Sequence, residues 1–303
     1  MSDSLKPPVI LLGNTRSGTS MVQNVMGAHP EIAAWYEPTE LWLCADPLRP
    51  HDEFTAADAT PRVRAYIRRR FLAYQRAHGG RRVLEKTPRN IFKIPYVRAI
   101  FPEACYLYIV RSPFSFISSV EFKWQQPVTG QGIRRRLKAA PPSQLPVHFA
   151  RWLSQQVNKR LLRRKYLSIW GPRYAGIQED VRTLDRLTVI ARQWAYGSRQ
   201  AEQALAEFPP GQVLRMRYED FVADPLAYVE RICAHCGLNM HPAVAQAARE
   251  MVHADRQNKW RRLDPADLAR VLPEIEEEMI RHGYEIPAEI AALAGRQPAG
   301  EGA

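Results

Sequence analysis

Residues 9–20 of the chain, VILLGNTRSGTS, decide its fold class. The uninterrupted apolar run Val9–Leu12 is typical of a parallel strand that is buried on both faces of a sheet. A turn follows from Gly13, and apolar residues then recur at helical spacing as far as His29. The stretch predicts a strand, a glycine-rich turn and a helix, whose backbone N–H groups at the positive helix end can bind a phosphate.

The turn matches a nucleoside-triphosphate loop only in part. Gly13 and Gly18 have the separation of the G-x-x-x-x-G-K-[ST] pattern, but Thr19 occupies the position of its lysine. The basic residue of the turn is Arg16. A loop without that lysine is poorly suited to ATP hydrolysis. A glycine turn that binds nothing is the alternative.

Strands alternate with helices along the rest of the chain. One strand is expected to begin at Val83 and to end within 85–88. Other strands are expected at 32–36, 105–110 and 211–216, and helices at 60–78, 91–101, 114–122, 147–167, 181–207, 225–236, 241–252 and 265–282, with an irregular segment over 123–146. This order predicts an α/β fold: a P-loop-like parallel sheet flanked by helices, with a helical insertion and a helical C-terminal region.

The composition narrows the class of protein. Of 303 residues, 46% are hydrophobic, which suffices for a core and argues against disorder. No run approaches the about 18 apolar residues of a membrane span, and the N-terminal apolar run is too short for a secretory signal. A net charge of +12 favours an anionic partner. Four cysteines are too few for a disulfide framework, and Cys233 and Cys236 are expected to be buried thiols, not zinc ligands.

Several segments resemble, in chain order, landmarks of the sulfotransferases that use 3′-phosphoadenosine-5′-phosphosulfate (PAPS). They are TRSGTS at 15–20, His29-Pro30-Glu31 with Glu37, Glu85-Lys86-Thr87-Pro88, Arg111 with Ser119 eight residues later, Tyr218-Glu219-Asp220 with Pro225, and Asn258-Lys259-Trp260-Arg261. The likeness is closest to the Golgi-type branch, which includes tyrosylprotein and glycan sulfotransferases and has arginine in the loop. It implies one sulfotransferase domain over 1–303, with a nucleotide-binding half at 8–122, a helical insertion at 123–210, and the last strand, C-terminal helices and nucleotide clamp at 211–290.

The resemblance implies PAPS as co-substrate and adenosine 3′,5′-bisphosphate (PAP) as product. The residues implied to hold the 5′-phosphosulfate are Thr15, Arg16, Ser17, Gly18, Thr19 and Ser20. Arg111 and Ser119 are implied to hold the 3′-phosphate, and a guanidinium with a hydroxyl can bind a phosphate monoester. Tyr218 is implied to contact the adenine or a phosphate, and Lys259, Trp260 and Arg261 to close over the nucleotide. Core packing of Tyr218 and an exposed basic loop at 259–261 are the alternatives.

Arg16 and Lys86 are the cations expected at the reacting group. Sulfuryl transfer moves SO₃ from a phosphate to a hydroxyl or amine, and like phosphoryl transfer it depends on in-line positioning and on stabilised charge at the leaving oxygens. Arg16 in the loop and Lys86 at a strand end suit this role, so the chemistry requires no metal. A surface arginine and a solvated lysine are the alternatives.

A carboxylate is expected to take the proton of the acceptor. Glu37 leaves a predicted strand beside the loop, eight residues after His29, as the base glutamate does in the tyrosylprotein enzymes. Its rivals are Glu40 and Glu85. The alternative interpretation of Glu40 is a glutamate in the first turn of a helix, where the helix dipole favours a carboxylate. The alternative interpretation of Glu85 is an ion pair with a nearby arginine. We expect Glu37 to be the general base.

Two other functions stay open on the sequence alone. They are a P-loop kinase that uses ATP and a nucleotide- or polyanion-binding module without catalysis. The acceptor is not identified, because glycans, peptides, lipids and small metabolites all suit the variable segments 41–80 and 123–180, and the oligomeric state is not predicted. No nucleic acid is expected, since the basic runs lack interleaved aromatic residues. The Ala- and Arg-rich composition without a signal favours a bacterial, cytoplasmic enzyme.

Overall fold

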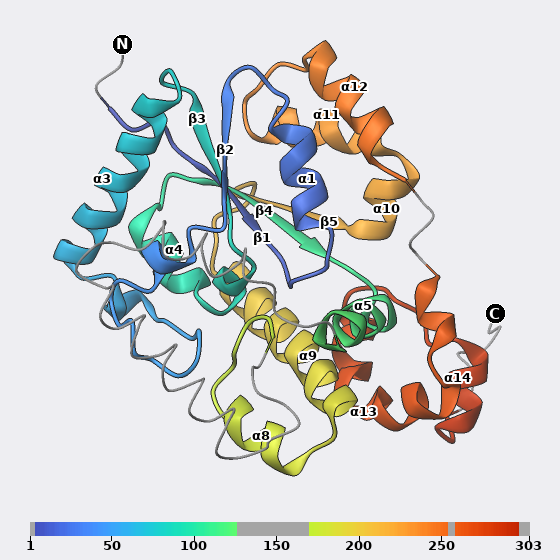
Figure 1. Ribbon diagram of the computed structural model, residues 1–303. Helices are drawn as coiled ribbons and strands as arrows, with labels where there is room; N and C mark the ends of the chain where they lie inside the picture. Colours follow the sequence, from blue (N-terminus) through green and yellow to red (C-terminus); the bar gives the residue numbers. More distant parts are fainter. Residues whose placement is uncertain (1–3, 126–169, 254–257, 297–303) are drawn as a thin grey trace.

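The computed structural model describes residues 4–125, 170–253 and 258–296 of the chain (Figure 1). The predicted helix over 147–167 and nearly all of the predicted irregular segment over 123–146 lie outside these residues. Within the described ranges, no helix combines the length and the apolar character that crossing a membrane requires.

A five-stranded parallel sheet forms the centre of the molecule, in the order β2-β3-β1-β4-β5. The strands are β1 (Val9–Leu12), β2 (Ile32–Tyr36), β3 (Arg82–Lys86), β4 (Cys105–Val110) and β5 (Val213–Arg217). In β1, Ile10 is paired with Glu85 of β3 on one side and with Tyr106 of β4 on the other. The predicted α/β fold with a parallel sheet is therefore confirmed.

Helices cover both faces of the sheet, which explains why its central strands are apolar throughout (Figure 1). Val9 and Leu11 pack with helices α1 (Thr19–Met26), α10 (Tyr218–Ala223), α11 (Pro225–His235) and α12 (Pro242–Met251). Ile10 and Leu12 belong to the core on the opposite face. That core includes α3 (Pro61–Ala77), α4 (Ile94–Ile100), α5 (Pro113–Gln125), α9 (Arg186–Leu205) and α13 (Pro265–Arg281).

The helix predicted over 91–101 is wrong at its start. A 3₁₀ helix, η2, occupies Pro88–Phe92, and α4 begins only at Ile94. Pro95 lies in the first turn of α4, where the missing N–H of proline costs no helical hydrogen bond. Proline therefore fixes the start of this helix.

The single helix predicted over 181–207 is also wrong, because it is two helices. Helix α8 spans Ile177–Thr183, and Leu184 is extended before α9 begins. The Asp185 carboxylate accepts hydrogen bonds from the backbone N–H groups of Leu187 and Thr188, and so caps α9. An aspartate cap thus divides an otherwise helical pattern.

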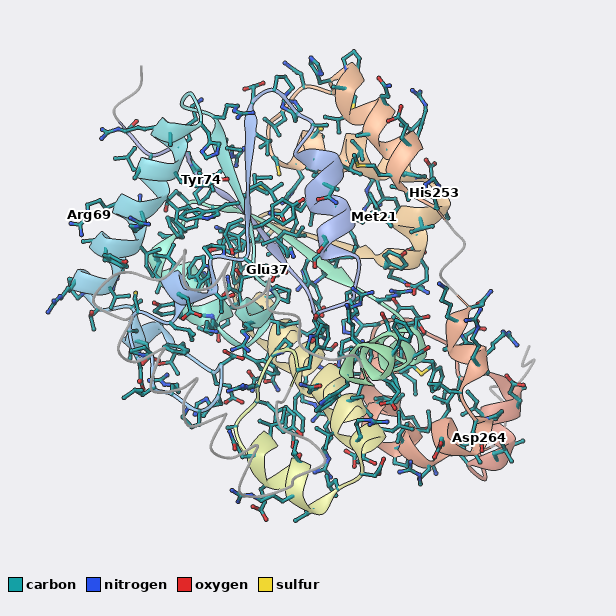
Figure 2. All side chains as sticks on the ribbon, in the orientation of Figure 1. Met21, Glu37, Arg69, Tyr74, His253 and Asp264 are labelled. Carbon is teal, nitrogen blue, oxygen red and sulfur yellow. The ribbon has the colours of Figure 1, made fainter. Side chains whose placement is uncertain are left out.

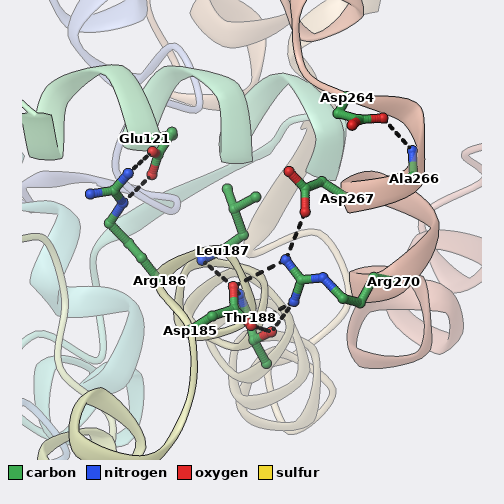
Figure 3. Close-up of polar contacts among 9 residues, drawn as sticks. All are labelled: Glu121, Asp185, Arg186, Leu187, Thr188, Asp264, Ala266, Asp267 and Arg270. Atoms are coloured by element: carbon green, nitrogen blue, oxygen red, sulfur yellow. Dashed lines mark hydrogen bonds and ion pairs between the residues drawn. The ribbon is translucent and has the colours of Figure 1, made fainter.

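Ion pairs tie α9 to α5 and α13 (Figure 3). Arg270 of α13 contacts Asp185 at 2.6 Å and Asp267 at 2.9 Å, and Arg186 of α9 pairs with both carboxylate oxygens of Glu121 on α5. Bidentate pairs of this kind fix geometry as well as adding stability. They hold α5 against α9.

Shorter elements complete the described part of the chain. They are α2 (Thr39–Trp42), η1 (Ala56–Asp58), η5 (Lys259–Arg262) and α14 (Ala288–Leu293). The chain crosses from β1 to β2 and β3 on one side, and then to β4 and β5 on the other. Ligands of parallel α/β sheets bind at the carboxyl ends of the strands beside such a reversal. The turn after β1 lies there.

Candidate active site

The turn after β1 is held from both sides by buried contacts. Asn14 is buried, and its side-chain N–H group donates to the carbonyl of Trp194 and to Ser198 Oγ, both at 3.3 Å, on α9. Gly18 is left-handed at φ 88°, and a Cβ there would overlap the Tyr218 ring. Only glycine fits this backbone conformation and this close approach. The turn is therefore packed against α9 on one side and Tyr218 on the other.

Arg16, Arg111 and Ser119 meet at this turn, although they come from three segments. The exposed Arg16 side chain donates from Nε to Ser119 Oγ at 2.9 Å. Arg111 is buried at the end of β4 and donates from Nη1 to the Arg16 carbonyl at 3.0 Å. Its guanidinium lies 4.4 Å from the centre of the Tyr218 ring, a cation–π contact. The structure thus brings Arg16, Arg111 and Ser119 together with Tyr218, another of the residues predicted to bind the nucleotide.

Ser17 gives the turn a feature that suits an anion. Its side chain is fully buried, and its Oγ has no hydrogen-bond partner within the described residues. A buried hydroxyl without a partner is costly, and an oxygen-rich ligand on the turn would satisfy it. Of its neighbours, Thr15 is half-buried, Thr19 is buried and Ser20 is exposed. Within the described ranges, no group of three or more His, Cys, Asp or Glu side chains is placed to hold a metal ion.

Lys86 connects the turn to Glu37. The Lys86 side chain is 1% exposed, and its Nζ donates to Glu37 Oε1 at 2.6 Å and to Ser20 Oγ at 3.1 Å. The backbone N–H of Glu37 also donates to the Lys86 carbonyl, at 3.1 Å, as a continuation of the β2–β3 pairing. Glu37 lies near the centre of the molecule in Figure 2, and its side chain is 36% exposed. A carboxylate open to solvent is therefore joined to the turn through one buried cation.

Arg16 and Glu37 also share an unusual backbone conformation. Among the described residues they are the only two outside glycine with positive φ, at 64° and 42° respectively. Such conformations disfavour residues that carry a Cβ and persist where the surrounding structure enforces them. Strained backbone of this kind gathers at functional sites, and here it occurs in the turn itself, at Arg16, and directly after β2, at Glu37.

Glu85 lies in the core of the protein and not at its surface. Its side chain is completely buried, and burial raises the pKa of its carboxyl to about 7. It accepts from Trp42 Nε1 at 3.0 Å, from Thr87 Oγ1 at 2.5 Å and from Asn90 Nδ2 at 3.3 Å. Successive residues of a strand face opposite sides, so Glu85 points away from Lys86. These three hydrogen-bond donors are uncharged, whereas the alternative from the sequence was an ion pair with an arginine.

Glu40 lies in the first turn of α2, one turn beyond Glu37. This is the position that the helix dipole favours for a carboxylate. Glu37, by contrast, is paired directly with Lys86 Nζ, at 2.6 Å.

The predicted clamp residues lie on η5, beside α5. Trp260 is buried and packs with its ring centre 5.5 Å from that of Phe114, near the start of α5. Arg261 is exposed and lies 4.9 Å over the Trp260 ring, and Lys259 is also exposed. Trp260 thus packs η5 against α5, the helix that bears Ser119. Lys259 and Arg261 face solvent.

Two site residues were not singled out from the sequence. Asn14 fixes the turn, and no local pattern distinguishes it from other turn asparagines. The Glu219 carboxylate accepts from the Ser112 backbone N–H at 3.1 Å and from Tyr284 Oη at 2.7 Å. Glu219 therefore positions the segment that follows Arg111. Its place in the Tyr-Glu-Asp landmark was the available signal.

Solved sulfotransferase structures share this fold. The sulfotransferase domain from the curacin biosynthetic pathway has a TM-score of 0.57 at 15% identity, over 94% of this chain and 100% of that one. The sulfotransferase domain from the Synechococcus PCC 7002 olefin synthase gives 0.56 at 14%, over 94% and 97%. Sulfotransferase STF9 from Mycobacterium avium gives 0.53 at 13%, over 93% and 78%. Identities this low show likeness of fold alone.

Sequence comparison gives the family. Nodulation protein NoeE of Sinorhizobium fredii (strain NBRC 101917 / NGR234) is 28% identical over 152 residues, which are 43% of this chain and 36% of that protein. The match thus spans about a third of the length of this relative. The sequence model of the sulfotransferase family matches residues 7–157 and 160–242. These ranges cover most of the chain, which therefore belongs to the sulfotransferase family.

Proposed function

We propose that the chain transfers a sulfuryl group from PAPS to a hydroxyl or amine acceptor, with Glu37 as general base. The observation that carries this proposal is the line of contacts from Glu37 through Lys86 to Ser20. It joins a solvent-accessible carboxylate to a turn suited to phosphate. A proton acceptor and an anion site side by side are what sulfuryl transfer to a hydroxyl requires.

The nucleotide would be held by the residues that converge on the turn. Arg16, the N-terminus of α1 and the buried Ser17 hydroxyl suit the 5′-phosphosulfate. Arg111 and Ser119 suit the 3′-phosphate that distinguishes PAPS and PAP from other adenine nucleotides. The exposed Lys259 and Arg261 would cover the nucleotide from η5. PAPS supplies the activated sulfuryl group.

The side chains have complementary tasks in the transfer. Glu37 accepts the proton of the acceptor hydroxyl as its oxygen bonds to sulfur. Arg16 and Lys86 stabilise the negative charge on the phosphate oxygen that leaves with the electron pair of the broken S–O bond. Both cations are fixed before the reaction, Arg16 by Ser119 and Lys86 by Glu37 and Ser20. They therefore need little reorganisation.

Binding and transfer assays on the full chain test the proposed function. In isothermal titration, we expect PAP to bind at least about ten-fold more tightly than ATP, because ATP lacks the 3′-phosphate that Arg111 and Ser119 would bind. Incubation with isotopically labelled PAPS and separate glycan, peptide, lipid and small-metabolite acceptors should add labelled sulfate to one class, read by mass spectrometry. Phosphate transfer from ATP would instead make the chain a kinase. PAP binding without transfer to any acceptor class would favour a non-catalytic module.

Arg111→Ala should weaken PAP binding far more than binding of adenosine 5′-phosphosulfate, which lacks the 3′-phosphate. A charge-assisted contact of this type contributes about 1.5–3 kcal/mol, so we expect at least a ten-fold loss for PAP in titration calorimetry. Arg217→Ala is a matched control. Arg217 is the last residue of β5, whereas Arg111 directly follows β4, and each guanidinium lies 4.4 Å over a tyrosine ring, that of Tyr284 for Arg217. Equal losses for both nucleotides in Arg111→Ala would assign Arg111 a structural role.

A further inference from the structure

Two thiols meet at the end of the sheet opposite the phosphate-binding turn. Cys105 is the first residue of β4, paired with Val9 at the start of β1, and Cys236 caps the C-terminus of α11. Their Sγ atoms are 2.7 Å apart, as a hydrogen-bonded pair of free thiols. Cys236 is buried and Cys105 is partly exposed. The two thiols are therefore in contact, and Cys105 is the more exposed residue of the pair.

The surroundings of the pair favour a thiolate on Cys105. The hydrogen bond from Cys236 lowers the pKa of Cys105 to about 6, with help from His235 and the positive charge of Arg82. The same hydrogen bond, together with burial, raises the pKa of Cys236. Arg82 is held in place by the carbonyls of Cys236 and Pro7. Since the thiolate is the reactive form of cysteine, Cys105, which is the more exposed residue of the pair, is the nucleophile.

We propose that Cys105 and Cys236 form a redox modification site, which a hydroperoxide such as hydrogen peroxide converts to a disulfide. The Cys105 thiolate attacks the peroxide, forming an S–O bond, breaking the O–O bond and releasing hydroxide. Cys236 sulfur then displaces the hydroxyl group of the sulfenic acid, which leaves as water with the Cys236 proton. The two sulfurs together lose two electrons, and the peroxide gains them.

The disulfide would link the sheet covalently to α11, one of the helices that cover it. It closes a loop between positions 131 residues apart and ties β4 to α11. Cross-links that close long loops stabilise a protein mainly by restricting its unfolded chain. We expect oxidation to raise the melting temperature by roughly 5–10 °C, and dithiothreitol to reverse the rise. This proposal is independent of the transfer reaction.

Peptide mapping of the full chain tests the proposal. The protein is treated with hydrogen peroxide, its remaining thiols are alkylated, and it is digested with trypsin without reduction. We expect one cross-linked species that joins peptide 99–111, which contains Cys105, to peptide 232–249, which contains Cys233 and Cys236. Fragmentation should place the link on Cys236. Alkylation of both Cys105 and Cys236 after peroxide treatment would overturn the proposal, as would a link to Cys233 or between two chains.

Serine variants separate this pair from the other two thiols. Cys105→Ser and Cys236→Ser should each abolish both the cross-linked species and the peroxide-dependent rise in melting temperature. Cys233→Ser, three residues from Cys236, and Cys44→Ser, near Tyr96, should retain both. The reversible shift in the wild-type chain keeps the test valid if a variant folds poorly. A shift that persists in Cys105→Ser would refute the assignment.

Discussion

A Glu37→Gln variant is expected to bind PAP as tightly as the wild type and to turn over roughly 10²–10⁴-fold more slowly, the range of lost acid–base catalysis. Glutamine preserves the shape of the side chain, and its carbonyl oxygen can still accept the hydrogen bond from Lys86 Nζ. It cannot accept the proton of the acceptor. Titration calorimetry with PAP and initial rates at saturating PAPS measure the two quantities separately.

Two further glutamines serve as controls for this variant. Glu40→Gln changes a first-turn carboxylate on α2 and should leave turnover within a few-fold of wild type. Glu85→Gln changes a buried acceptor of three hydrogen bonds, so its effect should fall mainly on the melting temperature. Normal turnover in Glu37→Gln with a large loss in Glu85→Gln would move the base to Glu85. If Glu37→Gln loses both PAP binding and thermal stability, the ion pair of Glu37 with Lys86 has a structural role.

The strands and the turn were predictable because their signals are local. Val9–Leu12, 32–36 and 105–110 are short β-prone or apolar runs, and the structure places strands at those residues. Gly18 can be recognised in the sequence, because it is a glycine directly before a predicted helix. The close approach of Tyr218 to Gly18 cannot be recognised there, since that contact joins residues 200 positions apart. Local sequence pattern therefore predicts the strands and the turn, but not the residues distant in the chain that pack against them.

The choice between Glu37 and Glu85 shows where sequence pattern is insufficient. Each carboxylate leaves a predicted strand beside the turn, and only the spacing of Glu37 from His29, which rests on the family resemblance, favours Glu37. Burial separates them, because Glu85 lies among Trp42, Thr87 and Asn90, whereas Glu37 faces Lys86 and solvent. That difference depends on tertiary structure, because the residues that enclose Glu85 include Trp42 of α2 and Asn90 of η2. It becomes visible only once the sheet and helices are assembled.

The same limit applies to pairs that are distant along the chain. Arg16 and Ser119 were both named as ligand-binding residues, but their direct hydrogen bond requires α5 to lie over the turn. The position of α5 depends in turn on Arg186 of α9 and its pair with Glu121. Cys105 and Cys236 belong to the same class, since no spacing rule links a strand residue to a helix cap. Tertiary packing alone creates these contacts.

Lys86→Met should lower turnover by roughly 10²–10³-fold, because it removes one fixed donor from the charge that develops in the transition state. Methionine fills much of the volume of the buried lysine stem, and Glu37, at 36% exposed, can be solvated by water when its partner is gone. The melting temperature should therefore fall only modestly. Initial rates at saturating PAPS and a thermal melt of the same sample measure both effects.

Lys93→Met provides the matched comparison for this variant. Lys93 is also completely buried and is also paired with a carboxylate, Asp52, at 3.2 Å, but its Nζ contacts neither Glu37 nor Ser20. Asp52 is itself buried, so losing Lys93 leaves a buried charge short of a partner and should cost more stability than losing Lys86. Turnover per folded molecule should stay within a few-fold of wild type. Equal losses of turnover in the two variants would mean that Lys86 acts through stability alone, and its place beside Glu37 would then have no part in the transfer.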